Sequence, residues 1–348
     1  MEIGTGHFMR CLALADALKK NGSNIRFVSR RLPEYLQGKL TEKGHGFALL
    51  KTPQSDTTPD ELSHASWLGI SQAQDATDSL RELSGTPWDW LVVDHYALDW
   101  RWESRAREST KKFLVIDDLA DRRHDCDVLL DQNLYAGMER RYSGKTPENC
   151  RMLLGPSFAL LGSEFRKLHE QARPRTGPVT RILVFFGGID AGNFTEKAID
   201  ILSGIAPAGL HVDVVIGAQH PSQERIKLAC AHHGFVCHVQ TEKMAELMAV
   251  ADLAIGAGGS ACWERCSLGL PALLVALADN QINIAKALDL FGACIYAGTS
   301  KATSDTVIRN AIISLISSPE KLMQISNKAY SLVDGLGAER VCREMGLK

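Results

Sequence analysis

The feature that most constrains the fold of this chain is an alternation between short apolar runs and amphipathic stretches. Short continuous runs rich in Val, Ile and Leu are typical of strands that are buried on both faces. Strands that alternate with helices form parallel sheets, so the pattern predicts an α/β fold. The runs lie at residues 25–28, 47–50, 90–93, 113–116, 128–130, 151–154, 181–186, 211–216, 235–239, 251–255 and 272–275.

A change in composition near the middle of the 348-residue chain indicates two domains. Residues 169–180 contain two prolines, a glycine and several polar side chains, which is typical of a linker. We expect an N-terminal domain at residues 1–168 and a C-terminal domain at residues 181–348, whose last helix can pack back on the first domain. Each domain is predicted to be a doubly wound, Rossmann-like parallel sheet, and the two are expected to face a cleft at the carboxyl ends of their strands.

The overall composition argues against several classes of protein. Lys and Arg number 39 against 41 Asp and Glu, for a net charge of −2, whereas nucleic-acid binders usually show a basic excess. No apolar run approaches the roughly 18–20 residues that span a bilayer, and the first residues do not resemble a secretory signal. We therefore expect a cytoplasmic monomer that binds neither nucleic acid nor membrane.

The nine cysteines are scattered and include no Cys-x-x-Cys pair, which favours reduced thiols in the core. Cys262 and Cys266 lie four positions apart on an expected helix, where a zinc site is conceivable. No second ligand pair follows at the spacing of a zinc finger. We expect no metal site and no bound cofactor.

A glycine-rich turn opens the first amphipathic helix. Gly4 and Gly6 let backbone amides approach a ligand, and the helix N-terminus adds free N–H groups and a partial positive charge. His7 falls in the first helical turn and Arg10 one turn later. The helix field disfavours imidazolium, so His7 is a candidate base near pH 7. The alternative is an ordinary strand-to-helix turn with a capping histidine.

Such a turn normally follows a buried strand, yet only residues 1–3 precede it. We therefore expect the N-terminal sheet to lack its first, central strand. We also expect the glycine-rich turn to be poorly anchored, which affects the placement of His7.

Polar side chains follow the apolar run at residues 90–93. Asp94, His95 and Tyr96 come at the end of this buried strand, where side chains point into the cleft of such a fold. Asp94 can orient His7 or His95, or cap the next helix, and Tyr96 can donate a hydrogen bond to a sugar. The alternative is a set of turn residues without a ligand.

Paired carboxylates follow the next strand. Asp117 and Asp118 invite a metal hypothesis, but aspartates at strand ends are also common helix caps and turn residues. We favour caps and turns for this pair.

The first strand of the C-terminal domain runs into a diglycine turn. Backbone N–H groups around Gly187 and Gly188 can hold a diphosphate without a lysine, and Asp190 or Asn193 can cap the helix that follows. The segment has no Gly-x-x-x-x-Gly-Lys-Ser/Thr pattern and is therefore not a P-loop. A diglycine by itself is weak evidence.

A second glycine-rich turn, which ends in Gly259 and Ser260, is the most specific of these motifs. With Ser260 as N-cap, the acid of a capping box would fall at Trp263, so Glu264 lies one position away from that structural role. A carboxylate there can accept two hydrogen bonds from a ribose diol while the helix N-terminus holds phosphate. The alternative is a solvated helix glutamate.

A polar cluster follows the strand at residues 272–275. Asp279, Asn280 and Gln281 supply amide and carboxylate groups that suit sugar hydroxyl or acetamido groups. The alternative is a helix start capped by Asp279.

Taken in order, these segments resemble the UDP-2,4-diacetamido-2,4,6-trideoxy-β-L-altropyranose hydrolases of pseudaminic acid biosynthesis, which are similar to GT-B glycosyltransferases but use water as the acceptor. The resemblance implies that His7, Tyr96 and Asn280 are the active-site residues and that the N-terminal domain holds the base. It also implies that UDP lies on the C-terminal domain, without a metal. The motifs that carry the resemblance are Gly-Thr-Gly-His-x-x-Arg-Cys-Leu-x-Leu-Ala (4–15), Val-Asp-His-Tyr (93–96), Phe-Gly-Gly-x-Asp-x-x-Asn (186–193), Gly-Ala-Gly-Gly-Ser-x-x-Trp-Glu-Arg (256–265) and Asp-Asn-Gln (279–281).

Within that family, the nucleotide contacts fall on Gly187 and Gly188, on Ser260 and on Glu264. We also expect the neighbouring motif residues to bind the substrate or UDP: Gly6, Arg10, Asp94, Asp190, Asn193, Gly259, Asp279 and Gln281. Two other functions remain open from the sequence. A GT-B glycosyltransferase would move the sugar to an organic acceptor, and the tryptophans of the first half, including Trp67, leave room for an acceptor surface. A non-catalytic UDP-sugar sensor would keep Glu264 without turnover.

Overall fold

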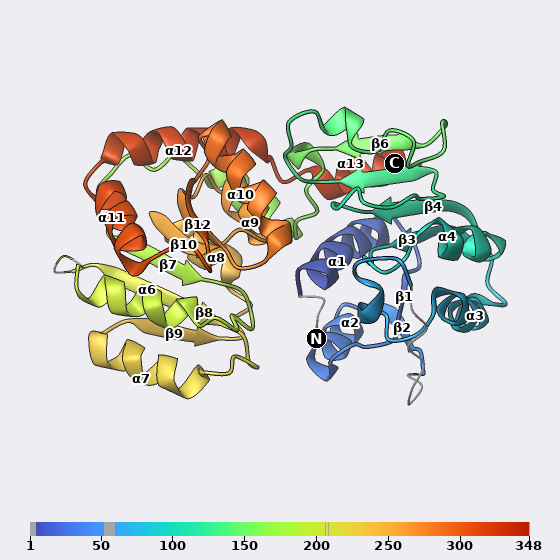
Figure 1. The fold of residues 1–348 in the computed structure, drawn as a ribbon, viewed down its shortest axis with the longest axis horizontal. Helices are drawn as coiled ribbons and strands as arrows, with labels where there is room; N and C mark the ends of the chain where they lie inside the picture. Colours follow the sequence, from blue (N-terminus) through green and yellow to red (C-terminus); the bar gives the residue numbers. More distant parts are fainter. Residues whose placement is uncertain (1–4, 52–59, 206, 208, 348) are drawn as a thin grey trace.

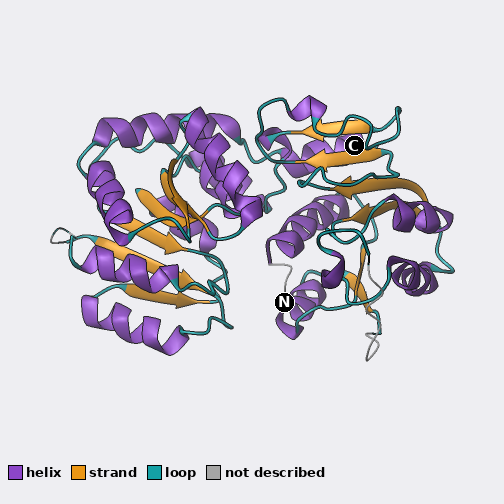
Figure 2. Ribbon diagram, viewed as in Figure 1, coloured by secondary structure: helices purple, strands orange, loops and turns teal. Residues whose placement is uncertain are grey.

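The computed structural model describes residues 5–51, 60–205, 207 and 209–347. Two α/β lobes lie side by side, and each contains parallel strands with helices packed against them (Figures 1 and 2). The predicted fold class, two Rossmann-like domains built on parallel sheets, is confirmed. Gly4, the first glycine of the opening motif, lies outside the described residues.

The N-terminal lobe is built from residues up to the end of η4, with a last helix that returns from the C-terminus. Its elements are α1 (Thr5–Lys20), β1 (Arg26–Ser29), α2 (Glu34–Glu42), β2 (Gly46–Leu49), η1 (Ala65–Trp67), α3 (Gln72–Leu83), β3 (Trp88–Val93), α4 (Trp100–Ala106), η2 (Arg107–Ser109), β4 (Thr110–Ile116), β5 (Val128–Asp131), η3 (Met138–Arg140), β6 (Arg151–Leu154), η4 (Pro156–Phe158) and α13 (Gly337–Glu344). The helix α5 (Ser163–Gln171) leads out of this lobe and packs in a hydrophobic cluster of the C-terminal lobe through Phe165.

The strands of this lobe form two sheets. β1 pairs with β2, and β3 to β6 form a four-stranded parallel sheet in sequence order, with Val93 opposite Val115. Among the described residues no strand joins these two sheets. α1 and α13 cover one face of β4 and β5, and the other face packs on α4 through Trp102.

The C-terminal lobe is a complete doubly wound domain. Its elements are β7 (Arg181–Phe185), α6 (Phe194–Ser203), β8 (His211–Ile216), α7 (Gln223–His233), β9 (Val236–Val239), α8 (Met244–Val250), β10 (Leu253–Ala257), α9 (Ala261–Ser267), β11 (Ala272–Ala276), α10 (Asp279–Phe291), β12 (Ile295–Thr299), α11 (Asp305–Ile316) and α12 (Pro319–Leu332). The strand order β12-β11-β10-β7-β8-β9 is parallel throughout, and hydrophobic clusters cover both faces.

The strand order places a topological switch point between β7 and β10. The chain winds outward from β7 through β8 and β9, and then returns to β10 on the other side of β7. Gly256 of β10 pairs with Phe185 of β7, so the two strands end at the same edge. Ligands of open α/β sheets bind in the crevice at this position. Both predicted phosphate-binding turns follow these two strands.

The segment predicted as a linker is fixed on the C-terminal lobe rather than extended between the lobes. Residues 169–171 complete α5, and the ring of His169 stacks on Tyr330 while its Nδ1 donates to the carbonyl of Ser267 over 2.6 Å. Arg175 donates to backbone carbonyls that include those of Ala251 and Met248. The last helix, α13, shares a hydrophobic cluster with α1 and β4.

In the part of the chain that the structure describes, no helix is long and apolar enough to cross a membrane. The tryptophans of the N-terminal lobe do not gather into an apolar surface. The indole N–H groups of Trp88, Trp90 and Trp102 donate to partners inside the lobe. Trp100 is exposed on α4.

Candidate active site

The diglycine turn after β7 has open space beside its backbone. Gly187 has a φ of +100°, which side-chain-bearing residues rarely adopt. A Cβ at Gly187 or Gly188 would meet no heavy atom within 4 Å, so the space beside the backbone is open. This geometry suits the predicted approach of a diphosphate to backbone N–H groups.

Asp190 has its carboxylate engaged inside the protein. The side chain is 5% exposed, and its oxygens accept hydrogen bonds from the backbone N–H groups of Phe194 (3.1 Å) and Thr195 (2.7 Å). This is a capping role for α6 and does not support the predicted contact of Asp190 with UDP. Asn193 takes the N-cap position with a φ of +50° and makes no side-chain cap bond; its amide donates to Glu196.

The turn between β10 and α9 presents Ser260 at the lobe junction. Ser260 is exposed and makes no side-chain cap hydrogen bond to α9, so its hydroxyl is not used for the predicted capping. The turn is held from below by Arg265, a buried residue that was not predicted. Its guanidinium donates to the carbonyl of Ala257 over 2.7 Å.

Glu264 lies in the first turn of α9 and is partly buried. Burial raises the pKa of its carboxyl to about 7; the charge of Arg265 opposes that rise and the Glu164 carboxylate adds to it. When ionised, this carboxylate can accept hydrogen bonds from a ligand, as the predicted contact with a ribose diol requires.

The start of α10 lies beside the same turn. Gln281 accepts a hydrogen bond from the backbone N–H of Leu277 at 2.9 Å through Oε1. Its Nε2 would lie 3.6 Å from a Cβ at Gly259, so the amide donor faces the glycine turn. Asp279 and Asn280 are exposed at the helix start.

The N-terminal lobe contributes a histidine–aspartate pair. His7 on α1 and Asp94 after β3 lie 2.6 Å apart between Nδ1 and Oδ1. The carboxylate can only accept, so Nδ1 carries a proton in this contact, and whenever the ring is neutral Nε2 is the proton acceptor. The structure thus favours one of the roles that the sequence left open for Asp94, the orientation of His7.

Arg10 fixes this pair. Its guanidinium donates to both oxygens of Asp94, over 2.7 Å from Nε and 2.6 Å from Nη2. Burial opposes ionisation of Asp94, but the charges of Arg10 and His7 outweigh it and hold the pKa of that carboxyl well below its usual range. Arg10 is itself buried, so it supports the site and does not present its charge to a substrate as predicted. The start of α1 is therefore better anchored than expected.

Asp118 also pairs with Arg10, over 3.1 Å. The sequence favoured a capping or turn role for both Asp117 and Asp118. Asp117 has such a role, because it accepts a hydrogen bond from the backbone N–H of Ala120 at 2.8 Å. Asp118 instead completes the charge network under His7. Nothing in its local sequence distinguishes it from its neighbour.

An aromatic cluster surrounds the pair. The ring of Tyr96 meets that of His7 edge-on, with centroids 4.7 Å apart, and also contacts His64 and Trp67. Tyr96 is only 3% exposed, and burial, followed by the nearby Asp118 charge, raises the pKa of its hydroxyl. His95 makes a turn contact through Nδ1, which accepts from the backbone N–H of Ala97 at 3.0 Å. Burial, followed by the nearby charge of His7, lowers the pKa of His95 to about 4.

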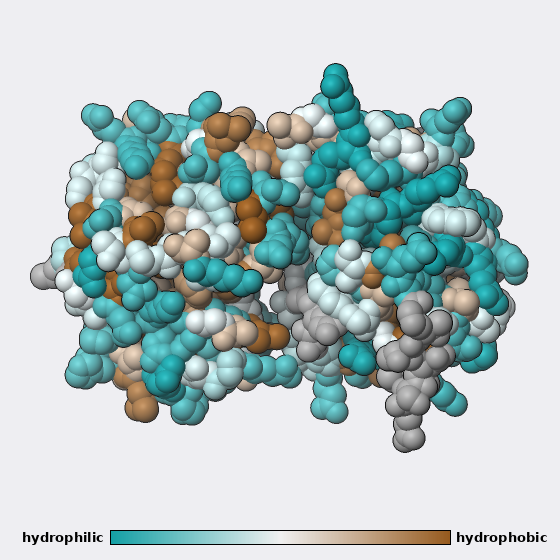
Figure 3. Space-filling view, viewed as in Figure 1, coloured by the Kyte–Doolittle hydropathy of each residue, from teal (hydrophilic) through white to brown (hydrophobic). Residues whose placement is uncertain are grey.

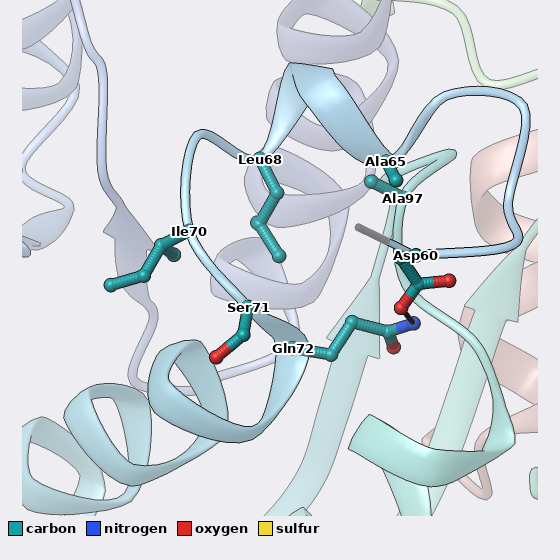
Figure 4. Close-up of a pocket in the computed structure, with 7 residues that line it drawn as sticks. All are labelled: Asp60, Ala65, Leu68, Ile70, Ser71, Gln72 and Ala97. Carbon is teal, nitrogen blue, oxygen red and sulfur yellow. Dashed lines mark hydrogen bonds between the residues drawn. The ribbon is translucent and has the colours of Figure 1, made fainter. Parts of the chain in front are cut away.

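A small cavity of about 40 Å³ lies beneath the segment that carries His64 and Trp67. Figure 4 shows this cavity between that segment and the residue after Tyr96. Its lining residues are Asp60, Ala65, Leu68, Ile70, Ser71, Gln72 and Ala97.

The two halves of the site meet at the N-termini of α1 and α9. A Cβ at Gly6 would lie 2.6 Å from the hydroxyl oxygen of Ser260, so glycine is needed for the lobes to approach here. Nearby, the indole of Trp263 donates to Asn133 of the N-terminal lobe over 3.1 Å. Figure 3 shows a hollow between the lobes below their contact. His7 is the next residue after Gly6 and therefore lies at this junction.

The described residues contain no group of three or more His, Cys, Asp or Glu side chains placed to hold a metal ion. Cys262 and Cys266, the conceivable zinc pair, are both buried, and burial raises the pKa of each thiol. Buried, protonated thiols are poor metal ligands.

The fold defines a protein of GT-B type, with two Rossmann-like lobes. The solved structures agree. MurG of Acinetobacter baumannii matches with a TM-score of 0.64 at 16% identity, covering 99% of this chain and 97% of that one. The calicheamicin glycosyltransferase CalG4 matches with a TM-score of 0.61 at 15% identity, covering 99% and 95%.

Within that class, residues 181–336 match the Glycosyltransferase family 28 C-terminal domain. The uncharacterized protein MJ1062 of Methanocaldococcus jannaschii is 22% identical over 81% of this chain and 54% of its own length. The spore coat polysaccharide biosynthesis protein SpsG of Bacillus subtilis is 27% identical over 56% of this chain and 57% of its own. The chain thus spans little more than half the length of these two relatives. The UDP-2,4-diacetamido-2,4,6-trideoxy-β-L-altropyranose hydrolase of Campylobacter jejuni is 26% identical over 71% of this chain and 77% of its own.

Proposed function

We propose that this protein is a nucleotide-sugar hydrolase that releases UDP from UDP-2,4-diacetamido-2,4,6-trideoxy-β-L-altropyranose, in pseudaminic acid biosynthesis. The observation that carries the proposal is the His7–Asp94 pair, 2.6 Å apart, one residue from the contact of Gly6 with Ser260. In this proposal His7 is the base, and it lies near the glycine turn that ends in Ser260. The name of the Campylobacter relative supports the choice of substrate.

In this proposal His7 activates the attacking water. Nε2 of the neutral imidazole takes one proton from the water as its oxygen bonds to the anomeric carbon, and Asp94 stabilises the imidazolium that forms. The bond between that carbon and the UDP oxygen breaks, and its electron pair leaves with UDP. Attack opposite the diphosphate inverts the anomeric centre through an oxocarbenium-like state.

The C-terminal lobe holds UDP in this proposal. Backbone N–H groups near Gly187, Gly188 and Gly259 and the hydroxyl of Ser260 face the diphosphate and stabilise its growing charge. Glu264 accepts the ribose hydroxyls. No divalent metal takes part, because the leaving diphosphate is stabilised by these donors.

The sugar lies between the lobes. Asn280, with Asp279 and Gln281 beside it, offers donors and acceptors for the acetamido groups from the start of α10. Tyr96 supports the ring of His7 from within the N-terminal lobe, 4.7 Å from centroid to centroid.

A glycosyltransferase acting on an organic acceptor is the second candidate, since the C-terminal half matches the family 28 domain. The two functions differ in what turnover requires. A hydrolase releases UDP in buffer alone, whereas a transferase does so only when an acceptor is added. Tight UDP binding without release under either condition would instead indicate a sensor.

The test is to incubate the protein with the diacetamido UDP-sugar and with UDP-N-acetylglucosamine, and to follow UDP release. We expect release from the diacetamido sugar without an acceptor. His7→Phe should lower turnover by roughly 10²–10⁴-fold and leave UDP binding little changed. His232→Phe, at an exposed histidine of α7, is the matched control and should retain full activity. An unchanged His7→Phe turnover would remove His7 from this role.

A further inference from the structure

Residues 60–72 form a loop whose two ends are tied together. Gln72 Nε2 donates to Asp60 over 3.3 Å, as Figure 4 shows. Arg101 of α4 donates to Asp60 at 2.9 Å, and Gln72 accepts the backbone N–H of Asp99 at 3.1 Å. Both ends of the loop are therefore bonded to the start of α4.

The tip of this loop lies on the aromatic cluster beside the proposed base. The rings of His64 and Trp67 are 4.6 Å apart between centroids. They lie 5.3 Å and 5.8 Å from the ring of Tyr96, which in turn packs on His7. Both tip residues are partly exposed, whereas Tyr96 is almost fully covered. The rings of His64 and Trp67 are therefore more accessible to a ligand than the ring of Tyr96.

One imidazole nitrogen of His64, Nδ1, is buried and has no hydrogen-bond partner among the described residues. Leaving such a group unpaired is unfavourable, so phenylalanine would serve ring packing alone better than histidine. A polar group supplied by a ligand would account for histidine at this position.

We infer that His64 and Trp67 form the wall that recognises the sugar of the proposed UDP-sugar substrate. The indole packs against an apolar part of the sugar, such as a 6-deoxy methyl or an acetamido methyl group. The imidazole pairs with an acetamido N–H or carbonyl after a small shift of the tip, which the cavity beneath the loop accommodates. The ligand class is thus an N-acetylated, deoxygenated hexose, and a fully hydroxylated hexose is disfavoured. This inference rests on the proposed function.

The test compares kcat/KM for the diacetamido UDP-sugar and for UDP-N-acetylglucosamine in four proteins. Trp67→Ala should lower kcat/KM for the diacetamido sugar by roughly tenfold and reduce the preference for it. His64→Phe should lower the same value by a similar factor without lowering the melting temperature, because it removes an unpaired buried nitrogen. Trp100→Ala, at a tryptophan 45% exposed on the same lobe, is the matched control and should match the wild type.

Calorimetry separates this inference from the proposed function. If the wild type hydrolyses neither sugar, the proposed function fails. The affinities for UDP and for the intact UDP-sugars can still be compared to test whether His64 and Trp67 contact the sugar. A sugar-dependent gain in affinity that Trp67→Ala loses and Trp100→Ala keeps supports the inference. Unchanged discrimination in both Trp67→Ala and His64→Phe, measured by rate or by binding, overturns it.

Discussion

Replacement of Asp94 by asparagine tests the histidine–aspartate pair most sharply, because it preserves size and removes the charge. Asp94 accepts from His7 and from Nη2 of Arg10 through Oδ1, each at 2.6 Å, and from Nε of Arg10 through Oδ2 at 2.7 Å. Asparagine has a single side-chain oxygen, so it can replace only one of the two carboxylate oxygens, Oδ1 or Oδ2. Its NH₂ group must face either Arg10 or His7, and both are donors.

Either orientation weakens the base. If the NH₂ group faces His7, the ring must accept at Nδ1, which moves the proton to Nε2 and prevents Nε2 from deprotonating water. If it faces Arg10, that guanidinium loses a partner and the imidazolium loses its counter-charge. We expect kcat to fall by about 10²–10⁴-fold, which is about 2.7–5.4 kcal/mol of transition-state stabilisation. UDP affinity should stay close to that of the wild type, because the proposed UDP contacts lie on the other lobe.

The assay is steady-state UDP release, with calorimetry for UDP binding and thermal unfolding for integrity. Asp125→Asn is the matched control, since Asp125 also pairs with an arginine, Arg107, and makes no contact with His7, Arg10 or Asp94. In a His7→Phe background, Asp94→Asn should cost little more, because both changes remove one catalytic unit. A folded Asp94→Asn protein that turns over at nearly the wild-type rate would refute the reasoning, and so would losses that multiply in the double variant.

Three further predictions concern Glu264, His124 and metal ions. Burial, with the nearby Glu164, raises the pKa of Glu264 to about 7, and ribose hydroxyls donate to the ionised form. The affinity for UDP-N-acetylglucosamine, measured by calorimetry, should therefore rise from pH 6 to pH 8. Glu264→Gln should bind more weakly, and its affinity should change less with pH. Burial lowers the pKa of His124, but hydrogen bonds and charges of Asp117 and Glu103 outweigh it and raise the value to about 9. The protonated His124 therefore stabilises the folded protein fully below its unfolded pKa of about 6.5, and this stabilisation, at most about 3 kcal/mol, is lost as pH rises through about 9. In chemical unfolding, the free energy of unfolding should fall more steeply over this range in the wild type than in His124→Gln. Equal slopes would contradict the assignment. Incubation with a strong chelator should leave UDP release unchanged, and its loss would contradict the metal-free stabilisation of UDP.

The fold was largely predictable because buried parallel strands leave a strong local signal. All eleven apolar runs correspond to strands, from β1 to β11. The twelfth strand, β12 (Ile295–Thr299), was not predicted. Its sequence Ile-Tyr-Ala-Gly-Thr is not a continuous apolar run, it lies at the sheet edge with every residue partly exposed, and its pairing with β11 contains an irregularity. Edge strands do not need the continuous apolar run that identifies central ones.

The site was predictable only where chemistry follows from position along the chain. The glycine turns after β7 and β10 and the polar end of β3 were found, because parallel strands end at one edge. The partner of Asp94 was left open, since His7 lies 87 positions away and only the fold selects it. The pairing of Asp118 with Arg10 and the contact of His64 with Tyr96 were not predicted for the same reason, and Asp190 was counted as a UDP contact although it caps α6.

The central claim is that water, activated by His7, attacks the anomeric carbon and displaces UDP. The most direct measurement follows the diacetamido UDP-sugar by ¹H and ³¹P NMR in water enriched in ¹⁸O, with no acceptor present. The account predicts UDP without ¹⁸O, because the bridging oxygen leaves with UDP, and a first-formed hemiacetal of inverted anomeric configuration. Incorporation of ¹⁸O into UDP, or a first product that retains the configuration, would contradict it.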